Sequence, residues 1–343
     1  MRRILIVELW NIGDVVLLMP FLAQLRALYS QASVTLLARP HARVILDGTG
    51  LVDEYIDDAS PADNWLSLNP LERGWRELWR LRRRLRELDF DLAFQCRLHV
   101  REHVILALSG ARRRIGYAFG EGDRMLTDAI TVDDPHRNKV DDWLNLLSVV
   151  GGPVATESPT LHVSEAERAK AAAFLGKHGI GAGDVVIGIH PGASLPGKRW
   201  PIDKFTAVAS DLAGRPDVRV VAFADPAGYG ASLGDIDGVV VAQTNLRELI
   251  ALIGRCALLV CNDSGPMHLA GGLGVPTVAI FGAGIARWFA PLGTGHELVS
   301  TAADTAGLES VEASRVLAAI ERALSARPAL RTQQPSLPPL SPT

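Results

Sequence analysis

The chain of 343 residues is longer than one ordinary domain and suits two domains of about 150 residues each. A hydrophobic content of 48% excludes global disorder, and a formal net charge of −3 gives no general attraction to nucleic acid, so no nucleic-acid partner is expected. The first element is a β-branched run at residues 3–8, which predicts a strand. A Gly-Asp turn follows, and the apolar segment after it predicts a helix that begins near Val15.

The same alternation of short apolar runs and helical segments continues through the first half of the chain. Further strands are predicted at residues 34–39, near Tyr55, at 91–96 and at 113–117. Short apolar strands that alternate with helices imply a mostly parallel sheet covered on both faces. The first half is therefore predicted to be one doubly wound α/β unit.

A second series of strands begins after an amphipathic helix at residues 164–179, which ends at a glycine. Five strands are predicted in it, at residues 185–190, 218–224, 238–243, 257–262 and 276–282. The fold class is thus α/β with two Rossmann-like doubly wound domains. We expect an N-terminal domain over 1–163, a linker helix region over 164–184, a C-terminal domain over 185–326 and a proline-rich disordered tail over 327–343.

The cysteines and the N-terminus indicate a reduced, cytoplasmic protein. Cys96, Cys256 and Cys261 are too few and too scattered for a disulfide framework, and they lie in apolar runs that favour buried thiols. No zinc-ligand spacing is present, so no metal site is predicted. The N-terminal apolar run is interrupted by Glu8 and Asp14, which is unlike a signal peptide, and no stretch of about 18 apolar residues could span a membrane.

Ligands of open parallel sheets bind beyond the carboxyl ends of the strands, so polar residues at those ends are site candidates. Asp14 follows the first strand, where a dinucleotide-binding enzyme would carry a G-x-G-x-x-G motif, but only Gly13 of such a motif is present. Asp14 could be a general base at the mouth of a cleft. Asp14 could instead be a helix N-cap, and the local sequence alone favours the cap.

Two loops in the second half could bind phosphate. Residues 190–201 (HPGASLPGKRWP) place the Ser194 hydroxyl and the Lys198 ammonium just before a helix that begins near Pro201, which favours a diphosphate site over a solvated loop. Residues 262–268 (NDSGPMH) predict a helix start at which free N–H groups face the loop. The local sequence does not decide between an anion site there and a capped helix with a structural His268.

A fourth candidate is the arginine-rich segment that contains Trp75, Leu78, Leu81, Leu85 and Leu88 at helical spacing, which predicts one buried stripe. Seven arginines lie between Arg73 and Arg86, and three more follow: Arg112, Arg113 and Arg114. Such a run could be a solvated helix face, or it could attract an anionic acceptor or phospholipid head groups.

Taken together, these segments resemble the ADP-heptose:lipopolysaccharide heptosyltransferase family, which is glycosyltransferase family nine. The resemblance extends to about residue 325. It is carried by the Gly13-Asp14 loop with the VVLLMPFLAQLR segment after it, by HPGASLPGKRWP, and by NDSGPMHLAGGLGVPTVAIFG, which closely resembles the family's D-[ST]-G-x-x-H-L-A segment. It implies a GT-B fold, in which the two domains face each other across a cleft, with the acceptor on the N-terminal domain and the nucleotide sugar on the C-terminal one.

The resemblance also implies residue roles and an activity. Asp14 matches the family's catalytic base, Lys198 and Ser194 match residues that face the diphosphate, and the donor-binding cluster corresponds to Asp263, Ser264, Gly265 and His268. Thr244 and Asp225 match nucleotide contacts more weakly, and Arg112, Arg113 and Arg114 are candidates for the acceptor. The expected reaction is metal-independent, inverting transfer of heptose from ADP-heptose to an acceptor hydroxyl in lipopolysaccharide core synthesis, with no cofactor.

The first loop departs from the family pattern. The family often has a basic residue where this chain reads Glu8-Leu9-Trp10-Asn11, so a different acceptor environment is indicated. One alternative is a glycosyltransferase of the same fold that uses another nucleotide sugar, or that uses a natural product or a protein as its acceptor. Others are a nucleotide-sugar epimerase of the same two-domain architecture and a non-catalytic nucleotide-sugar-binding protein. An NAD-dependent dehydrogenase is disfavoured because the glycine motif is missing. The partners expected are the donor and a glycan or glycolipid acceptor, and a peripheral position at the cytoplasmic face of the inner membrane stays open.

Overall fold

A computed structural model describes residues 2–57, 75–132, 137–152, 160–283, 286, 288–303 and 306–326. The chain divides into two compact units. Unit 1 comprises Met1–Ala169 with Asn245–Ala251 and Arg287–Leu292, and unit 2 comprises Lys170–Thr244, Leu252–Ala286 and Gly293–Thr343. The boundaries expected from the sequence stay predictions, and the proline-rich tail over 327–343 lies outside the described residues.

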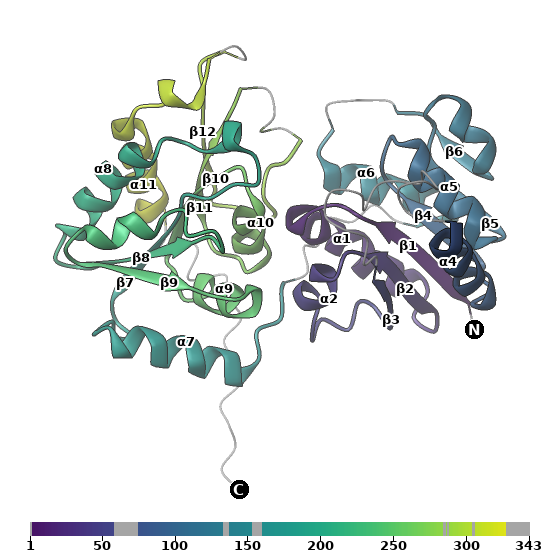
Figure 1. The fold of residues 1–343 in the computed structure, drawn as a ribbon, viewed down its shortest axis with the longest axis horizontal. Coiled ribbons are helices and arrows are strands. Elements are labelled where there is room, and N and C mark those ends of the chain that lie inside the picture. Colours follow the sequence, from purple (N-terminus) through teal and green to yellow (C-terminus); the bar gives the residue numbers. More distant parts are fainter. Residues whose placement is uncertain are drawn as a thin grey trace, which may run out of the picture. The chain divides into compact units, whose positions relative to one another are not determined.

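The first sheet has six parallel strands in the order β3-β2-β1-β4-β5-β6 (Figure 1). The strands are β1 (Arg3–Glu8), β2 (Ser33–Ala38), β3 (Glu54–Asp57), β4 (Leu92–Gln95), β5 (Arg113–Tyr117) and β6 (Asp128–Ile130). The central strands β1 and β4 are buried along almost their whole length, as expected for a parallel sheet with both faces covered. The predicted strands are all present, and β6 is an additional short edge strand.

The helices of this part are α1 (Ile12–Leu28), α2 (His41–Ile45), α4 (Trp75–Glu87), α5 (Val100–Ser109) and α6 (Lys139–Asn145), with 3-10 turns η1 (Gly120–Met125) and η2 (Leu146–Val150). Helix α1 is buried on most of its surface and packs against α6. It begins at Ile12, three residues earlier than expected. In α4, Leu85 is fully buried but Leu78, Leu81 and Leu88 are only half-buried, so the predicted stripe is shallower than the spacing indicated; the Trp75 side chain lies outside the described residues.

The second sheet also has six parallel strands, in the order β12-β11-β10-β7-β8-β9. Its strands are β7 (Val185–His190), β8 (Val218–Ala224), β9 (Val239–Gln243), β10 (Leu258–Asn262), β11 (Thr277–Phe281) and β12 (Glu297–Ser300). Of these only β12, another edge strand, was not predicted from the sequence.

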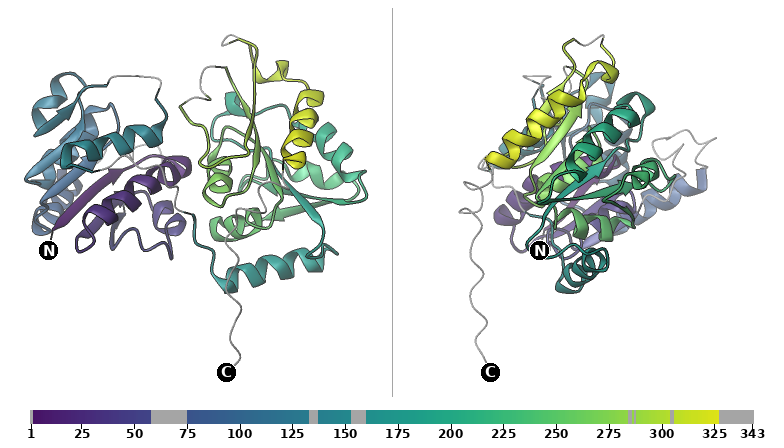
Figure 2. Two further views of the ribbon diagram at one scale, coloured as in Figure 1. Left: turned by 180° about the vertical axis from the view of Figure 1, so that it is seen from behind. Right: turned by 90° about the vertical axis from the view of Figure 1, so that its left-hand side faces the viewer.

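The helices that follow α6 in the chain are α7 (Glu165–Lys177), α8 (Ile202–Ala213), α9 (Leu246–Ile253), α10 (Gly265–Gly272) and α11 (Ala313–Ser325), with 3-10 turns η3 (Pro196–Lys198), η4 (Ala231–Asp235) and η5 (Leu308–Ser310). Figure 2 shows α11 lying beside α8, and these two helices share one apolar core with the sheet. That core is fully buried at Trp200, Phe205 and Ile320.

Both sheets have the same topology. In each, the first and fourth strands of the series are neighbours, and the chain runs outward from this pair in opposite directions. The pair is β1/β4 in the first sheet and β7/β10 in the second. This is the doubly wound Rossmann order, and its switch point lies between the two named strands of each sheet. The prediction of two Rossmann-like α/β sheets is confirmed.

Two smaller expectations can be compared with the structure. Cys96, Cys256 and Cys261 are all buried thiols, and burial raises the pKa of Cys256 to about 12. Within the described ranges, no helix combines the length and apolar character needed to cross a bilayer.

Candidate active site

The loop after β1 places Asp14 in the first turn of α1. Asn11 is the N-cap of this helix and Asp14 is its third residue, so the expectation that Asp14 itself caps the helix is wrong. The backbone N–H of Asn11 donates to Asp14 Oδ2 at 3.0 Å, as in a capping box. The second oxygen, Oδ1, accepts a short hydrogen bond from Arg97 Nη2. Both oxygens of the carboxylate are therefore held in place.

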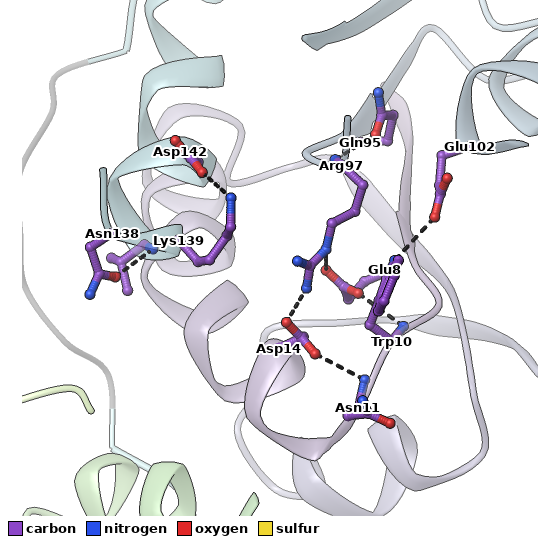
Figure 3. Close-up of polar contacts among 11 residues, drawn as sticks. Glu8, Trp10, Asn11, Asp14, Gln95, Arg97, Glu102, Asn138, Lys139 and Asp142 are labelled. Carbon is purple, nitrogen blue, oxygen red and sulfur yellow. Dashed lines mark hydrogen bonds and ion pairs between the residues drawn. The ribbon is translucent and has the colours of Figure 1, made fainter. Parts of the chain in front are cut away.

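Arg97 lies two residues after β4, on the other side of the switch point from Asp14. Figure 3 shows its side chain extending toward both Glu8 and Asp14. The guanidinium stacks over the Trp10 ring at 4.8 Å, and the indole N–H of Trp10 donates to Glu102 Oε1 at 3.1 Å. The Arg97 side chain is only 13% exposed, so this cation is held in a mostly buried position beside the candidate base.

Glu8, the last residue of β1, completes the group. Its Oε1 accepts the backbone N–H of Trp10 at 3.0 Å, and its Oε2 lies 4.0 Å from Arg97 Nε. Burial raises the pKa of Glu8 to about 8; Arg97 opposes this rise and the negative charge of Asp14 adds to it. At neutral pH Glu8 is thus mainly protonated, and Arg97 balances the single charge of Asp14.

At the switch point of the second sheet, Asn262 links the loop over 190–201, one of the two candidate phosphate-binding loops, to β10. Its Nδ2 donates to the carbonyl oxygen of Pro191 at 2.7 Å, and its Oδ1 accepts the backbone N–H of Trp200 at 3.0 Å. The Trp200 ring is fully buried and donates to the carbonyl oxygen of Val311 at 3.0 Å. The loop over 191–200 is therefore anchored near both of its ends.

The loops after β7 and β10 meet in an ion pair. Lys198 Nζ lies 2.6 Å from Asp263 Oδ2, and the lysine side chain is 34% exposed whereas that of Asp263 is 10% exposed. Ser264 is the N-cap of α10, and Gly265 is the first helical residue. The N–H groups of a first helical turn have no partners within the helix, so this end can bind an anion beside the Lys198 cation. His268 is buried one turn further into α10.

The remaining donor candidates lie at strand ends of the same sheet. Ser194 is exposed on the anchored loop, and Thr244 directly follows β9. Asp225 directly follows β8, where its Oδ1 accepts the N–H groups of Ala227 and Tyr229 at 2.9 and 2.8 Å and closes its own turn. The structure brings Lys198, Asp263, Ser264 and Gly265 together. Among the residues that it describes, it gives Ser194 and Thr244 no side-chain partner that would fix their roles.

Other contacts stabilise the loops at the carboxyl edge of the second sheet. Arg199 donates through Nε to the carbonyl oxygen of Ala193 at 2.9 Å and stacks over the Tyr229 ring at 4.7 Å, which joins two neighbouring loops. His190 ends β7, and burial lowers its pKa to about 4, against a smaller opposing effect of Asp225. His190 is therefore neutral at physiological pH.

The predicted acceptor arginines lie elsewhere. Arg113 begins β5 and pairs with Asp128 at 2.6 Å, Arg112 pairs with Asp91 at 3.0 Å, and Arg114 donates to the carbonyl oxygen of Met125 at 2.6 Å. Because the strands are parallel, this is the amino edge of the sheet, opposite the edge that carries Asp14. The structure does not bring these arginines and the candidate base together, and their acceptor role stays a prediction.

Arg97 and the anchoring role of Asn262 were not predicted from the sequence. Both lie at the carboxyl end of a strand of a switch-point pair, which is the signal that could have identified them. Arg97 also places a basic group beside the first loop. That loop itself carries Glu8, in the segment where a basic residue is often expected. In the part of the chain that the structure describes, no three His, Cys, Asp or Glu side chains come together as a metal site.

Comparisons with known proteins agree with this architecture. The sequence profile of glycosyltransferase family 9 (heptosyltransferase) matches residues 78–315. The lipopolysaccharide heptosyltransferase 2 of Salmonella typhimurium is 26% identical over 299 residues, which cover 82% of each chain. A family 9 glycosyl transferase from Veillonella parvula superposes with a TM-score of 0.80 at 24% identity, covering 94% of this chain and 97% of that one. The ADP-heptose lipopolysaccharide heptosyltransferase II of Escherichia coli superposes with a TM-score of 0.77 at 22% identity, covering 96% and 100%.

The family profile covers more than half of the chain, and it includes both the Arg97 segment and the Lys198–Asp263 pair. The protein therefore belongs to glycosyltransferase family 9, the heptosyltransferases, and is a glycosyltransferase.

Proposed function

We propose that the protein transfers a heptose from ADP-heptose to a hydroxyl group of a lipopolysaccharide core acceptor, with inversion at the anomeric carbon and without a metal ion. The single observation that carries this proposal is the Lys198–Asp263 pair at the start of α10, at the switch point of the second sheet. The donor sugar and the acceptor class are those that the names of the relatives print.

The loops at the carboxyl edge of the second sheet suit a diphosphate. The Lys198 ammonium is one-third exposed and lies beside the first turn of α10, where backbone N–H groups and the helix dipole favour negative charge. Ser264 and Gly265 are small, so a phosphate can approach the backbone closely. As the bond to the sugar breaks, charge grows on the departing ADP, and these fixed donors stabilise it where many transferases use a metal ion.

The Asp14 carboxylate at the carboxyl edge of the first sheet suits proton removal. Asp14 would take the proton of the attacking hydroxyl, whose oxygen forms the new bond to the anomeric carbon while the bond to the diphosphate oxygen breaks on the opposite face. One displacement of this kind inverts the anomeric configuration. The proton ends on the Asp14 carboxylate and the negative charge ends on ADP.

The test is turnover of ADP-heptose by the purified protein with heptose-deficient lipopolysaccharide as acceptor and EDTA present. We expect ADP release that depends on the acceptor, and a product whose anomeric configuration, read by NMR, is opposite to that of the donor. Asp14→Asn should abolish transfer. Asp203→Asn, which changes an exposed acid in the first turn of α8, is the matched control and should remain active.

Other results would redirect the proposal. Preferential turnover of UDP- or GDP-sugars over ADP-heptose would retain the glycosyltransferase activity and reject ADP-heptose as the donor. Binding of ADP-heptose without any product would identify a non-catalytic sugar-nucleotide-binding protein. Normal transfer by an intact Asp14→Asn variant would reject the base.

A peripheral position at a membrane surface is part of the proposal, because a lipopolysaccharide acceptor is anchored in lipid. Helix α4 is suited to it: six arginines and two glutamates lie within its thirteen residues, although the whole chain has a net charge of −3. Trp79 on the same helix is 58% exposed. Exposed arginines beside a tryptophan are typical of helices that contact anionic lipid head groups.

A further inference from the structure

Arg97 lies between two carboxyl groups that compete for it. Its Nη2 donates to Asp14 Oδ1, whereas its Nε lies 4.0 Å from Glu8 Oε2, which is too far for a hydrogen bond. Both Nε of Arg97 and Oε2 of Glu8 are buried and lack a hydrogen-bond partner among the described residues. A small rotation of the arginine side chain toward Glu8 would satisfy both atoms and would weaken its contact with Asp14.

Contacts with the described residues limit the freedom of the guanidinium. One face is covered by the Trp10 ring, and that ring is fixed by its hydrogen bond to the fully buried Glu102 (Figure 3). The backbone N–H of Arg97 donates to Oε1 of Gln95 at 2.7 Å, and Gln95 is itself fully buried. A cation with so little freedom is pre-organised, so its contact with Asp14 costs little further entropy.

We propose that Arg97 is a positioning residue that fixes the Asp14 carboxylate for proton removal, and that Glu8 competes with Asp14 for the same guanidinium. The inference rests on the proposed function, because Asp14 is the catalytic residue only if the protein transfers a sugar to a hydroxyl. With Glu8 protonated, Arg97 pairs with Asp14. With Glu8 ionised, Arg97 is drawn toward Glu8 and the base loses its positioning contact.

The charges around Glu8 set where this change occurs. Arg97 favours its ionised form, while burial and the negative charges of Asp14 and Glu102 favour its protonated form, and together they hold its pKa at about 8. His41, on α2 beside the first loop, has a pKa lowered by burial and is neutral in this range. Glu8 is therefore the group near Asp14 whose charge changes at mildly alkaline pH.

The experiment compares kcat for ADP release from about pH 7 to about pH 9, on either side of the pKa of Glu8, in the wild-type protein and in Arg97→Met, Arg97→Lys and Glu8→Gln. Loss of the contact in Arg97→Met should lower kcat about a hundredfold with little change in KM for the donor, since a misplaced catalytic group costs on that order. Arg97→Lys should recover part of this loss. Arg26→Lys, which keeps the charge of an ion pair at the other end of α1, is the matched control.

The pH profile separates positioning from a merely structural role. The wild-type kcat should fall as the pH rises through about 8, and Glu8→Gln should remove this fall because a neutral amide does not attract Arg97. A structural role for Glu8 would change stability and leave the shape of the profile unchanged. An alkaline fall that persists in Glu8→Gln would overturn the competition, and a normal kcat in Arg97→Met would overturn the positioning role.

A second measurement does not depend on catalysis. In a double-mutant cycle of urea unfolding with Arg97→Met and Asp14→Asn, the double variant should be destabilised by less than the sum of the single variants. Additive effects would overturn the contact. An inactive wild-type protein would overturn the proposed function, and with it the catalytic part of this inference, whereas an active protein with additive effects and an unchanged profile would overturn the inference alone.

Discussion

The side-chain oxygen of Asn262 accepts the backbone N–H of Trp200 at 3.0 Å, while its amide nitrogen donates to the carbonyl oxygen of Pro191 at 2.7 Å. One fully buried amide at the end of β10 thus holds the loop that carries Lys198. Lys198 in turn pairs with Asp263, the next residue after Asn262. The geometry of the proposed donor site therefore depends on a side chain that need not touch the donor.

Asn262→Ala should lower both stability and donor affinity. Two buried backbone groups would lose their partner, which we expect to cost about 2 kcal/mol in the free energy of unfolding. The loosened loop should weaken ADP binding about tenfold. Urea unfolding and calorimetric titration with ADP measure the two effects.

Asn145→Ala is the matched control. Asn145 donates to the hydroxyl of Tyr117 at 3.1 Å in the first sheet, so its loss should affect stability and leave ADP affinity unchanged. ADP affinity that stays at the wild-type value in Asn262→Ala would contradict the anchoring role.

Lys198→Ala should reduce ADP affinity by about one to two orders of magnitude, because a charge-assisted hydrogen bond to a phosphate is worth about 1.5–3 kcal/mol. It should change stability little, since the side chain is one-third exposed. Lys198→Arg keeps the charge and should retain part of the affinity. Calorimetric titration with ADP in the presence of EDTA measures these affinities. Equal ADP affinity of Lys198→Ala and the wild type would contradict a role of Lys198 in diphosphate binding.

The sheets could be predicted from the sequence because their central strands are continuous apolar runs, as parallel strands buried on both faces must be. The edge strands β6 and β12 were missed: they are short and only partly buried, with Asp128 in one and Glu297 in the other, and their composition does not distinguish them from loops. Their pairing depends on neighbours that are distant in the chain.

The candidate donor residues could be proposed from the sequence because they cluster in two short motifs, whereas Arg97 could not. It follows an apolar strand in a segment with no motif, and its importance appears only when β4 is placed beside β1. The start of α1 was misplaced for a similar reason. Asn11 and Asp14 are both good capping residues, and only the backbone geometry shows that Asn11 is the cap while Asp14 completes the box.

The pH dependence of stability should show the unusual pKa of Glu8. A carboxyl whose pKa is raised from 4.5 to about 8 on folding stabilises the protein fully below pH 4.5, and this contribution is lost as the pH rises through about 8. Glu8→Gln should remove this loss, so at about pH 9 the variant should exceed the wild type by up to about 5 kcal/mol in the free energy of unfolding. Urea unfolding at several pH values measures it, and parallel curves for the two proteins would contradict the assignment.

His190 should lower the stability of the protein as the pH falls, whereas Glu8 lowers it as the pH rises. Its pKa is lowered from 6.5 to about 4, so its contribution to stability is present above pH 6.5 and is lost as the pH falls toward 4. His190→Gln should reduce the acid sensitivity by up to about 3 kcal/mol between these limits. His178→Gln, at an exposed position after α7, is the matched control. An acid sensitivity unchanged in His190→Gln would reject the buried neutral histidine.

Helix α4 should bind anionic vesicles. Arg76, Arg80 and Arg82 are exposed, and each arginine near such a surface contributes about 1 kcal/mol, so their joint change to Gln should weaken binding about a hundredfold. Changing Arg255, Arg315 and Arg322 to Gln removes the same charge from exposed positions outside α4 and is the matched control.

Co-sedimentation with phosphatidylglycerol–phosphatidylethanolamine vesicles measures binding, with phosphatidylcholine vesicles as the neutral reference. Trp79→Ala should lower the part of the binding that resists salt, because the ring inserts at the interface rather than pairing with charge. Equal weakening by both triple variants would mean that net charge alone governs the attraction, and α4 would then be a solvated helix.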